Sequence, residues 1–276
     1  MPKYCFLNGE ILPASEASIN VYDIGILRGY GVYDGIAVYN GKPFRFEDHM
    51  ARLRRSAGSL NISVPYSDIE ISDAISKLLV KNQQERAILR VILTGGPTLE
   101  GIRYEPNKST FYIVMEDFPP FPQQFIENGG MLISHEFERY LPESKTLNYI
   151  EAVRMQEERH RVGAIELLYT SHGKVLEAAT SNFFAFIGDA LVTPKDMMLK
   201  GITRKVALEL AESHYEIEER ELTLEETLSS TEAFITSSFK EIVPIVRIDE
   251  RTISSGKPGE KTKHLIELFS EYAKNY

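Results

Sequence analysis

Three prolines within four residues interrupt this chain before its midpoint, in the run Asp117-Phe118-Pro119-Pro120-Phe121-Pro122. Proline lacks a backbone N–H and restricts φ, so such a run ends a helix or central strand and forms a stiff connector. A fresh β-rich pattern begins at Met131. We therefore predict two domains, residues 1–117 and 124–276, joined by a connector at 118–123, in preference to one domain with a long surface loop.

The composition indicates a soluble globular protein. The chain has 276 residues, 43% hydrophobic and 26% charged, which is enough to bury a large core. Its net charge of −9 argues against nucleic acid or an anionic membrane as the main partner. The single cysteine, Cys5, cannot form an internal disulfide, and Met1–Glu10 lacks a secretion pattern. We expect a cytoplasmic protein without a membrane span.

Strand-like and helical patterns alternate in the first half. Asn8-Gly9 predicts a hairpin turn, and Ser67-Asp68-Ile69-Glu70 resembles a capping box that begins a helix ending near Lys81. Apolar residues on one face predict another helix over 46–60. The expected strands are 35–39, 87–93 and 110–115.

The second half shows the same mixture. Helical patterns cover 149–161, 202–213 and 259–273. The expected strands are 164–169, 174–177, 182–187 and 190–192. Both halves therefore combine strands and helices, as in an α/β or α+β protein.

Three local signals follow one another in this second half. Lys145 lies at a loop-to-helix junction, where loss of water makes an amine a better nucleophile toward an aldehyde. Glu177 ends a strand and can pair with a protonated pyridine nitrogen. Gly201-Ile202-Thr203-Arg204 begins a helix whose free amides suit a phosphate group. Each has an ordinary interpretation alone, as a solvated lysine, a surface carboxylate or a capped helix. Together they predict a pyridoxal 5'-phosphate site.

These residues also match a known family over nearly the whole chain. The ordered motifs are His49-x-x-Arg52-Leu53, Lys145-x-x-Asn148, Glu177-x-x-x-Ser181-Asn182-Phe183, Thr193-Pro194, Leu199-x-Gly201-Ile202-Thr203-Arg204, Thr231-Glu232-Ala233-Phe234 and Glu241-Ile242-Val243-Pro244. With them the chain resembles the fold-type IV pyridoxal-phosphate enzymes, which include branched-chain and D-amino acid aminotransferases and aminodeoxychorismate lyases. The resemblance implies a homodimer and a smaller N-terminal α/β domain. It also implies a larger C-terminal β-barrel-like domain with helices, which carries the cofactor lysine.

The resemblance also implies roles for individual residues. Lys145 would be the Schiff-base lysine and the base that shuttles the substrate proton, and Glu177 would keep the pyridine nitrogen protonated. Leu199 would lie against the cofactor ring, and Tyr149 would bond its phenolic oxygen. The phosphate would be held by Arg52, Ile202, Thr203 and Ser238. Without the motif, Arg52 would be read as one residue of a solvated basic helix face. We predict no metal site.

The residues that select the substrate are less defined. Tyr33 would form a pocket wall, and Phe239 lies in a turn that binds the α-carboxylate in branched-chain enzymes. Ala37 replaces the arginine of that subfamily's strand motif, and the arginine-x-histidine trap of the D-amino acid enzymes is missing from Thr94–Thr98. Two other arginines are candidates for the substrate carboxylate. Arg103 is otherwise an exposed loop arginine, and Arg90 is otherwise half of a structural ion pair.

These features predict an aminotransferase that exchanges an amino group between an amino acid and a 2-oxo acid such as 2-oxoglutarate. A branched-chain-like substrate is our first choice, and D-amino acid transamination is the close alternative. A lyase that releases pyruvate from aminodeoxychorismate is less favoured, because its characteristic threonine has no counterpart at Ile36 or Ala37. A non-catalytic cofactor-binding protein is disfavoured by Lys145, since binding alone requires no covalent bond.

Overall fold

The computed structural model describes residues 3–276, which divide into two compact units. The first unit runs to Pro119 and also contains Ser144–Asn148 and Tyr276; the second unit consists of Pro120–Glu143 and Tyr149–Asn275. The break after Pro119 falls within the proline run. The segment Ser144–Asn148, which the sequence pattern assigns to residues 124–276, belongs instead with the first unit.

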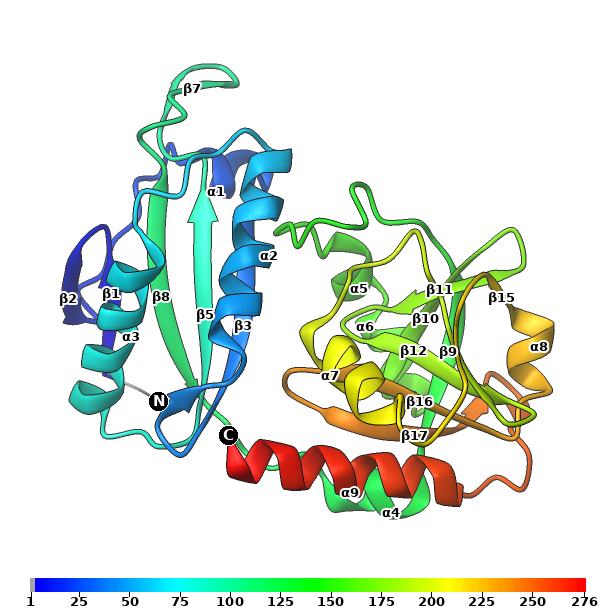
Figure 1. Cartoon of the computed structure of the whole chain (residues 1–276). Coiled ribbons are helices and arrows are strands. Elements are labelled where there is room, and N and C mark those ends of the chain that lie inside the picture. Colours follow the sequence, from blue (N-terminus) through cyan, green and yellow to red (C-terminus); the bar gives the residue numbers. More distant parts are fainter. Residues whose placement is uncertain (1–2) are drawn as a thin grey trace. The chain divides into compact units, whose positions relative to one another are not determined.

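The first unit is built on a six-stranded antiparallel sheet (Figure 1). Across the sheet, its strands are β2 (Glu10–Pro13), β1 (Tyr4–Leu7), β8 (Thr110–Asp117), β5 (Ala87–Thr94), β3 (Gly31–Tyr39) and β4 (Lys42–Pro43). The predicted hairpin at Asn8-Gly9 is confirmed, and Gly9 has a φ of +103° that favours glycine. A separate small sheet contains β6 (Thr98–Glu100) and β7 (Arg103–Tyr104).

Helices α2 (Phe46–Ser59) and α3 (Asp68–Asn82) cover one face of this sheet, and the short α1 (Ile24–Arg28) precedes β3. Alternate residues of the central strands, including Leu89 and Val91, pack against Leu53 of α2 and Ile75 of α3. The predicted capping box is confirmed, since the side chains of Ser67 and Glu70 each bond the other's backbone N–H. The apolar faces of both helices therefore form one core with the sheet.

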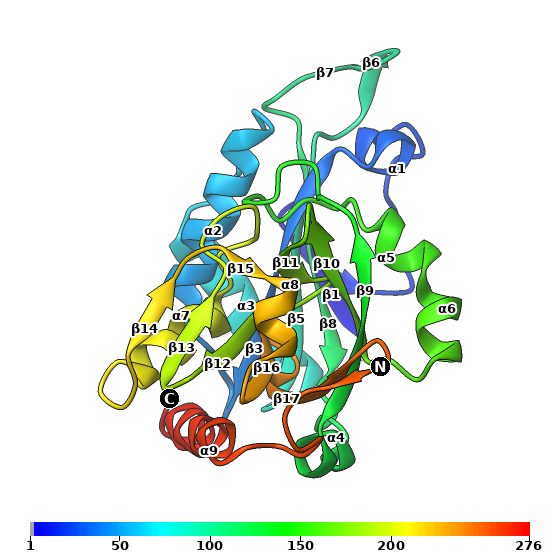
Figure 2. The ribbon, with the colours of Figure 1, turned by 90° about the vertical axis from the view of Figure 1, so that its right-hand side faces the viewer.

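The second unit is a ten-stranded sheet that curls into a half-barrel (Figure 2). Its main path is β14 (Ile217–Glu219), β13 (Ala190–Thr193), β12 (Asn182–Ile187), β16 (Glu232–Ser237), β17 (Glu241–Ile248), β9 (Gly130–Glu136), β10 (Glu166–Ser171), β11 (Lys174–Ala178) and β15 (Leu222–Thr223). Strand β18 (Arg251–Thr252) pairs with β17 off this path. The sheet is mixed, because β9 runs parallel to both β10 and β17, and β13 runs parallel to β14.

Six helices accompany the second sheet: α4 (Gln123–Asn128), α5 (Ile150–Arg154), α6 (Gln156–Arg161), α7 (Ile202–Ala211), α8 (Leu224–Leu228) and α9 (Glu260–Asn275). Helices α7 and α9 contact each other and both lie against β16, and α9 also lies against β17. Phe184 and Phe234 stack on neighbouring strands, with ring centroids 4.7 Å apart. Phe183 and Ile235 point to the opposite face and join the core of the half-barrel.

Two local predictions differ from the structure. The helix expected over 149–161 is divided into α5 and α6 at Met155. The proline run leads directly into α4, which the sequence did not indicate, and the rings of Phe121 and Phe125 pack together there. Within residues 3–276, no helix is long and apolar enough to cross a membrane.

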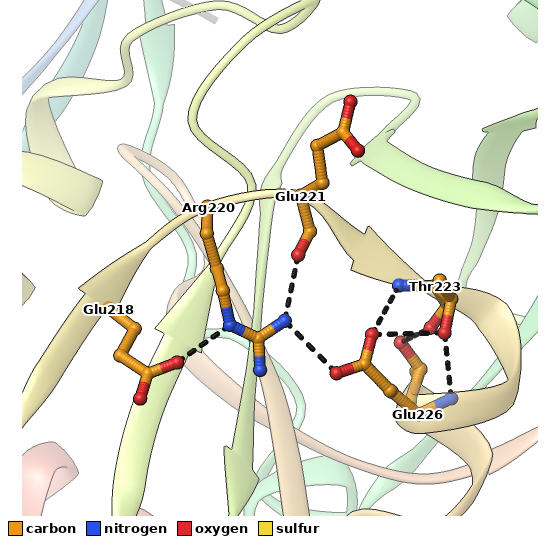
Figure 3. A network of polar contacts seen from close by, with 6 residues as sticks. Glu218, Arg220, Glu221, Thr223 and Glu226 are labelled. Carbon is orange, nitrogen blue, oxygen red and sulfur yellow. Dashed lines mark hydrogen bonds and ion pairs between the residues drawn. The ribbon is translucent and has the colours of Figure 1, made fainter.

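A polar network fixes the connection between β14 and α8 (Figure 3). Arg220 donates to Glu218 at 2.6 Å and to the carbonyl oxygen of Glu221 at 2.8 Å, and it forms a 3.0 Å ion pair with Glu226. The carboxylate of Glu226 also accepts from Thr223, which caps α8. These contacts explain the charged residues of this segment structurally and involve none of the predicted site residues.

Candidate active site

The Lys145 segment lies as an extended chain beside β3. The Tyr33 amide donates to the Lys145 carbonyl oxygen at 3.0 Å, and the Leu147 amide donates to that of Gly31 at 3.0 Å. The Lys145 amide itself donates to Ser56 Oγ, on α2, at 3.0 Å. These bonds on both sides of Lys145 fix its backbone, so only the side chain remains to be oriented.

The side chains of Lys145 and Tyr33, both predicted site residues, lie together. The Lys145 amine lies 4.6 Å from the centroid of the Tyr33 ring, and the lysine is half-buried. An aromatic ring attracts a cationic amine and also displaces water from it. The arrangement provides an amine in a fixed and partly dry position, as a covalent catalyst requires.

Arg52, the predicted phosphate ligand, is buried in the first unit. Its Nε and Nη2 atoms donate to the two carboxylate oxygens of Asp34, at 2.9 and 2.7 Å. His49 Nδ1 lies 2.7 Å from the same carboxylate. Asp34 was not among the predicted site residues. A signal was present, because Asp34 is a charged residue in the core-facing register of β3, between Val32 and Ile36.

The two arginines proposed for the substrate carboxylate lie in different environments. Arg90, on β5, donates to Glu116 of β8 at 2.6 and 3.0 Å and is partly exposed. Its cross-strand neighbour is Gly35, so Arg90 and Tyr33 share the sheet face opposite the helices. Arg103 lies on β7 and is exposed.

Glu177 is buried near the end of β11 in the second unit. One carboxylate oxygen accepts from Arg139 Nε at 2.7 Å, and the other accepts from the Leu199 amide at 3.1 Å. The Arg139 cation offsets the charge that Glu177 carries into the interior. No sequence pattern pointed to Arg139, because it lies in an irregular segment and meets Glu177 only through the fold.

The start of α7 is an uncapped helix N-terminus held by Asn182. The Asn182 side-chain amide donates to the Leu199 carbonyl oxygen at 2.7 Å. A Cβ added to Gly201 would lie 2.0 Å from Asn182 Oδ1, so only glycine allows this approach. Gly201, at the N-cap, provides no side-chain bond to the following amides, those of Ile202 and Thr203. A helix end of this kind favours an anion.

A buried hydroxyl lies on the same sheet face as Asn182. Thr236 is paired directly with Asn182 across β12 and β16, so the two side chains point to the same side. Among the described residues, the Thr236 hydroxyl has no hydrogen-bond partner although Thr236 is only 1% exposed. Such a group requires a partner from outside the chain or is costly. A ligand with oxygen atoms could supply that partner.

The turn after β16 carries Ser238 and Phe239, and its end is fixed by Lys240. Lys240 Nζ donates to Glu166 Oε1 at 2.5 Å and to Thr180 Oγ1 at 2.8 Å. Burial would raise the pKa of Glu166, but the Lys240 charge and the hydrogen bonds to the carboxylate hold that pKa below its usual range. The charge of Lys240 is therefore balanced. Glu166 was not among the predicted residues, because nothing near it in the sequence indicates a distant lysine partner.

Tyr149 precedes α5 and lines a pocket of about 300 Å³. Glu166, Thr180 and Lys240 line the same pocket, together with residues of α5 and α6.

Arg204, in the first turn of α7, has a structural role, since its Nη2 donates to the Pro194 carbonyl oxygen at 2.9 Å and to Glu219 at 2.7 Å. The helix start therefore presents amides and hydroxyls from this unit, without the Arg204 cation.

Comparison with known proteins identifies the family. Residues 31–248 match the amino-transferase class IV family. The chain belongs to the class IV aminotransferases. This family uses pyridoxal 5'-phosphate. Within the second unit, the buried Glu177 carboxylate and the uncapped start of α7 are groups of the kind that can hold a pyridine nitrogen and a phosphate. Within the first unit, the Lys145 amine is a group that can bond an aldehyde.

The relatives of this class IV aminotransferase include both a branched-chain and a D-alanine aminotransferase. A putative branched-chain-amino-acid aminotransferase of Methanocaldococcus jannaschii is 34% identical over 96% of this chain and 95% of its own. A D-alanine aminotransferase of Bacillus licheniformis is 31% identical over 94% of this chain and 93% of its own. The solved branched-chain amino acid aminotransferase from Escherichia coli has the same fold. The two structures superpose with a TM-score of 0.90 at 25% sequence identity. The match covers 100% of this chain and 95% of that one.

Proposed function

We propose that this aminotransferase binds pyridoxal 5'-phosphate through Lys145 and transfers an amino group from an amino acid to a 2-oxo acid such as 2-oxoglutarate. The supporting observation is the fixed backbone of Lys145, with its amine against the Tyr33 ring. A lysine held in this way can bond the cofactor aldehyde and, once released, move a proton at the substrate carbon. The bound cofactor supplies an electron sink that stabilises negative charge on that carbon.

The second unit would supply most of the cofactor contacts. The Glu177 carboxylate, offset by Arg139, would hold the proton on the pyridine nitrogen. Leu199, whose amide is bonded to Glu177, would lie against the ring, and Tyr149 would bond the phenolic oxygen. The phosphate would take the amides of Ile202 and Thr203, the hydroxyl of Ser238 and the guanidinium of Arg52.

For the substrate we propose an L-amino acid with a branched apolar side chain. The Methanocaldococcus jannaschii relative supports this choice. The pairing of Lys240 with Glu166 also supports it, because the turn that carries Phe239 then adds no net charge to a pocket wall. Of the two candidate arginines, we favour Arg90, because it shares a sheet face with Tyr33. Its Nε and Nη2 atoms hold Glu116, so it would bind the carboxylate through the rest of the guanidinium or by releasing Glu116.

D-amino acid transamination is the second candidate. The Bacillus licheniformis D-alanine aminotransferase, at 31% identity, supports it nearly as well as the first relative supports the first choice. The short Lys145-Thr146-Leu147-Asn148 spacing also resembles the D-amino acid enzymes. The two candidates differ in the configuration of the substrate carbon. If its single hydrogen faces Lys145 in both cases, the carboxylate and the side chain of a D-amino acid take each other's places relative to an L-amino acid.

A half-reaction test separates these candidates. The purified protein should be yellow, and Lys145→Ala should abolish the colour while Lys108→Ala, at an exposed lysine paired with Glu105, should keep it. Mixing the yellow enzyme separately with L-leucine, L-valine, D-alanine and D-glutamate should bleach it only with the branched L-amino acids. Bleaching by the D-amino acids alone would favour the second candidate. A colourless protein that takes up no cofactor would refute both.

We also propose that two copies of the chain form a homodimer, as the family resemblance implies. The segment before α1 and α1 itself expose Val21, Tyr22 and Ile26, which are 70%, 65% and 61% exposed. Clustered exposed apolar residues are typical of interfaces. Sedimentation should show a dimer that Ile26→Glu weakens and that Ile69→Glu, at an exposed position on α3, leaves intact. A monomeric wild type at micromolar concentration would contradict this proposal.

A further inference from the structure

The first unit contains a buried charged cluster of which the proposed function uses only Arg52. Asp34 of β3 is 0% exposed, His49 is 1% exposed and Arg52 is 4% exposed. The Asp34 carboxylate binds the Nε–Nη2 edge of Arg52 through two hydrogen bonds, at 2.9 and 2.7 Å. This two-point contact fixes the plane of the guanidinium as well as its position.

The protonation of this cluster follows from its burial. Burial alone would raise the pKa of Asp34, but the charge of Arg52 and the hydrogen bonds from both partners hold it well below its usual range. Burial lowers the pKa of His49, although Asp34 acts in the opposite direction. His49 is therefore neutral and Asp34 ionised. The 2.7 Å bond then requires the proton on Nδ1, because an ionised carboxylate can only accept.

Hydrogen bonds therefore link the three residues in one order, from His49 through Asp34 to Arg52. His49 donates to Oδ1 of Asp34, which also accepts from Arg52 Nη2. The 3.5 Å separation of Arg52 Nη2 and His49 Nδ1 is no hydrogen bond, because both atoms are donors. Arg52 is thus oriented by Asp34, and Asp34 is oriented by His49. Truncating either residue would remove part of what holds the plane of the guanidinium.

We propose that Asp34 and His49 are positioning residues that fix the Arg52 guanidinium in the orientation in which it binds the cofactor phosphate. This inference rests on the proposed function, because it requires Arg52 to contact the phosphate. It adds that the affinity for the phosphate depends on two side chains that bind no cofactor atom themselves. A rigid supporting shell is how proteins hold a binding group in one geometry. The alternative is a purely structural ion pair, which would contribute to folding alone.

The test compares two ligands that differ only in the phosphate. Calorimetric titration of the full chain, stripped of cofactor, would give affinities for pyridoxal 5'-phosphate and for pyridoxal. Asp34→Asn should lower the affinity for pyridoxal 5'-phosphate about tenfold or more, because it removes a charged partner of Arg52. Its affinity for pyridoxal should change about twofold or less. Arg52→Met should show the same selective loss, and combining it with Asp34→Asn should add little.

Matched variants separate positioning from folding. Asp68→Asn removes the carboxylate partner of Arg54, an arginine on the same helix, and should leave both affinities unchanged. His49→Asn retains a donor near the position of Nδ1 and should keep the affinity for pyridoxal 5'-phosphate. His49→Leu removes the donor and should lower it about threefold to tenfold. The His49 pair keeps the test valid if Asp34→Asn does not fold.

Each outcome has one meaning. Equal losses for both ligands in Asp34→Asn and His49→Leu, or stability losses without a change in the affinity ratio, would overturn the positioning role. If Arg52→Met binds both ligands as well as the wild type, Arg52 is no phosphate ligand and the inference fails. The proposed aminotransferase function would survive that result as long as the protein is yellow and loses its colour in Lys145→Ala.

Discussion

The buried carboxylate of Glu177 accepts a hydrogen bond from Arg139 at 2.7 Å, joining a strand residue to an irregular segment 38 positions earlier in the chain. Both side chains are less than a tenth exposed. The positive charge of Arg139 offsets the cost of burying the negative charge of Glu177. The Leu199 amide donates a second hydrogen bond to the same carboxylate.

Removing Arg139 should therefore be costly. Arg139→Met leaves an uncompensated buried carboxylate, and we expect the free energy of unfolding to fall by about 3–5 kcal/mol. Urea denaturation of the cofactor-free protein would measure this change. Lys174→Met, which breaks an exposed ion pair with Glu221, should have little effect. A similarly small effect of Arg139→Met would show that buried Glu177 does not depend on the Arg139 charge.

The Lys240–Glu166 pair should make stability depend on pH in a defined direction. The pKa of Glu166 is lowered in the folded state, so its contribution is present above the unfolded pKa of about 4.3. That contribution is lost as pH falls toward the lower, folded pKa. Lys240→Met removes the main attraction that lowers the pKa of Glu166. The stability difference between wild type and variant should therefore be largest near neutral pH and shrink below about pH 4.3.

Denaturation at several pH values tests this prediction. Lys263→Met, at an exposed lysine that pairs with Glu260, serves as a surface control and should show little difference from wild type at neutral pH. A stability difference for Lys240→Met that stays constant between neutral and acidic pH would contradict the assignment. It would mean that Lys240 contributes through packing rather than through the charge of Glu166.

Gly201→Ala should disturb the start of α7. The new Cβ would lie 2.0 Å from Asn182 Oδ1, so Asn182 would have to leave the Leu199 carbonyl oxygen. We expect a loss of about 1–3 kcal/mol in the free energy of unfolding and weaker binding of pyridoxal 5'-phosphate. Gly58→Ala is the matched control. It lies exposed within α2 with no atom near the added Cβ, and should stabilise the protein by about 0.5–1 kcal/mol.

Thr236→Val tests whether the buried hydroxyl serves a ligand. Its removal takes away an unpartnered polar group, so the cofactor-free protein should be equally or more stable. Affinity for pyridoxal 5'-phosphate should fall about fivefold or more, as after loss of one hydrogen bond. Thr262→Val removes a similarly unpartnered hydroxyl on α9 and should leave the cofactor affinity unchanged. Equal affinities in both variants would show that the Thr236 hydroxyl takes no part in binding.

Short stretches of the sequence determine the local features of this protein. The hairpin at Asn8-Gly9 and the capping box at Ser67 depend on backbone preferences of a few adjacent residues, and both are present. The motifs around Lys145, Glu177 and Gly201 also sufficed to indicate the family, because each carries a chemical group in a recognisable local setting. The proline run likewise lies where the first unit ends.

The partners of these groups were decided only by the tertiary structure. Asp34 is 18 residues from Arg52, Arg139 is 38 residues from Glu177, and Lys240 is 74 residues from Glu166. Strand pairing and helix packing bring each pair together. Asp34 left a local signal, a charge in the core-facing register of β3, but no local pattern marked Arg139 or Glu166. The Lys145 segment follows the proline run yet packs on β3 and α2 of the first unit. Sequence thus determined which reactive groups are present, while long-range burial and hydrogen bonding determined what holds them in place.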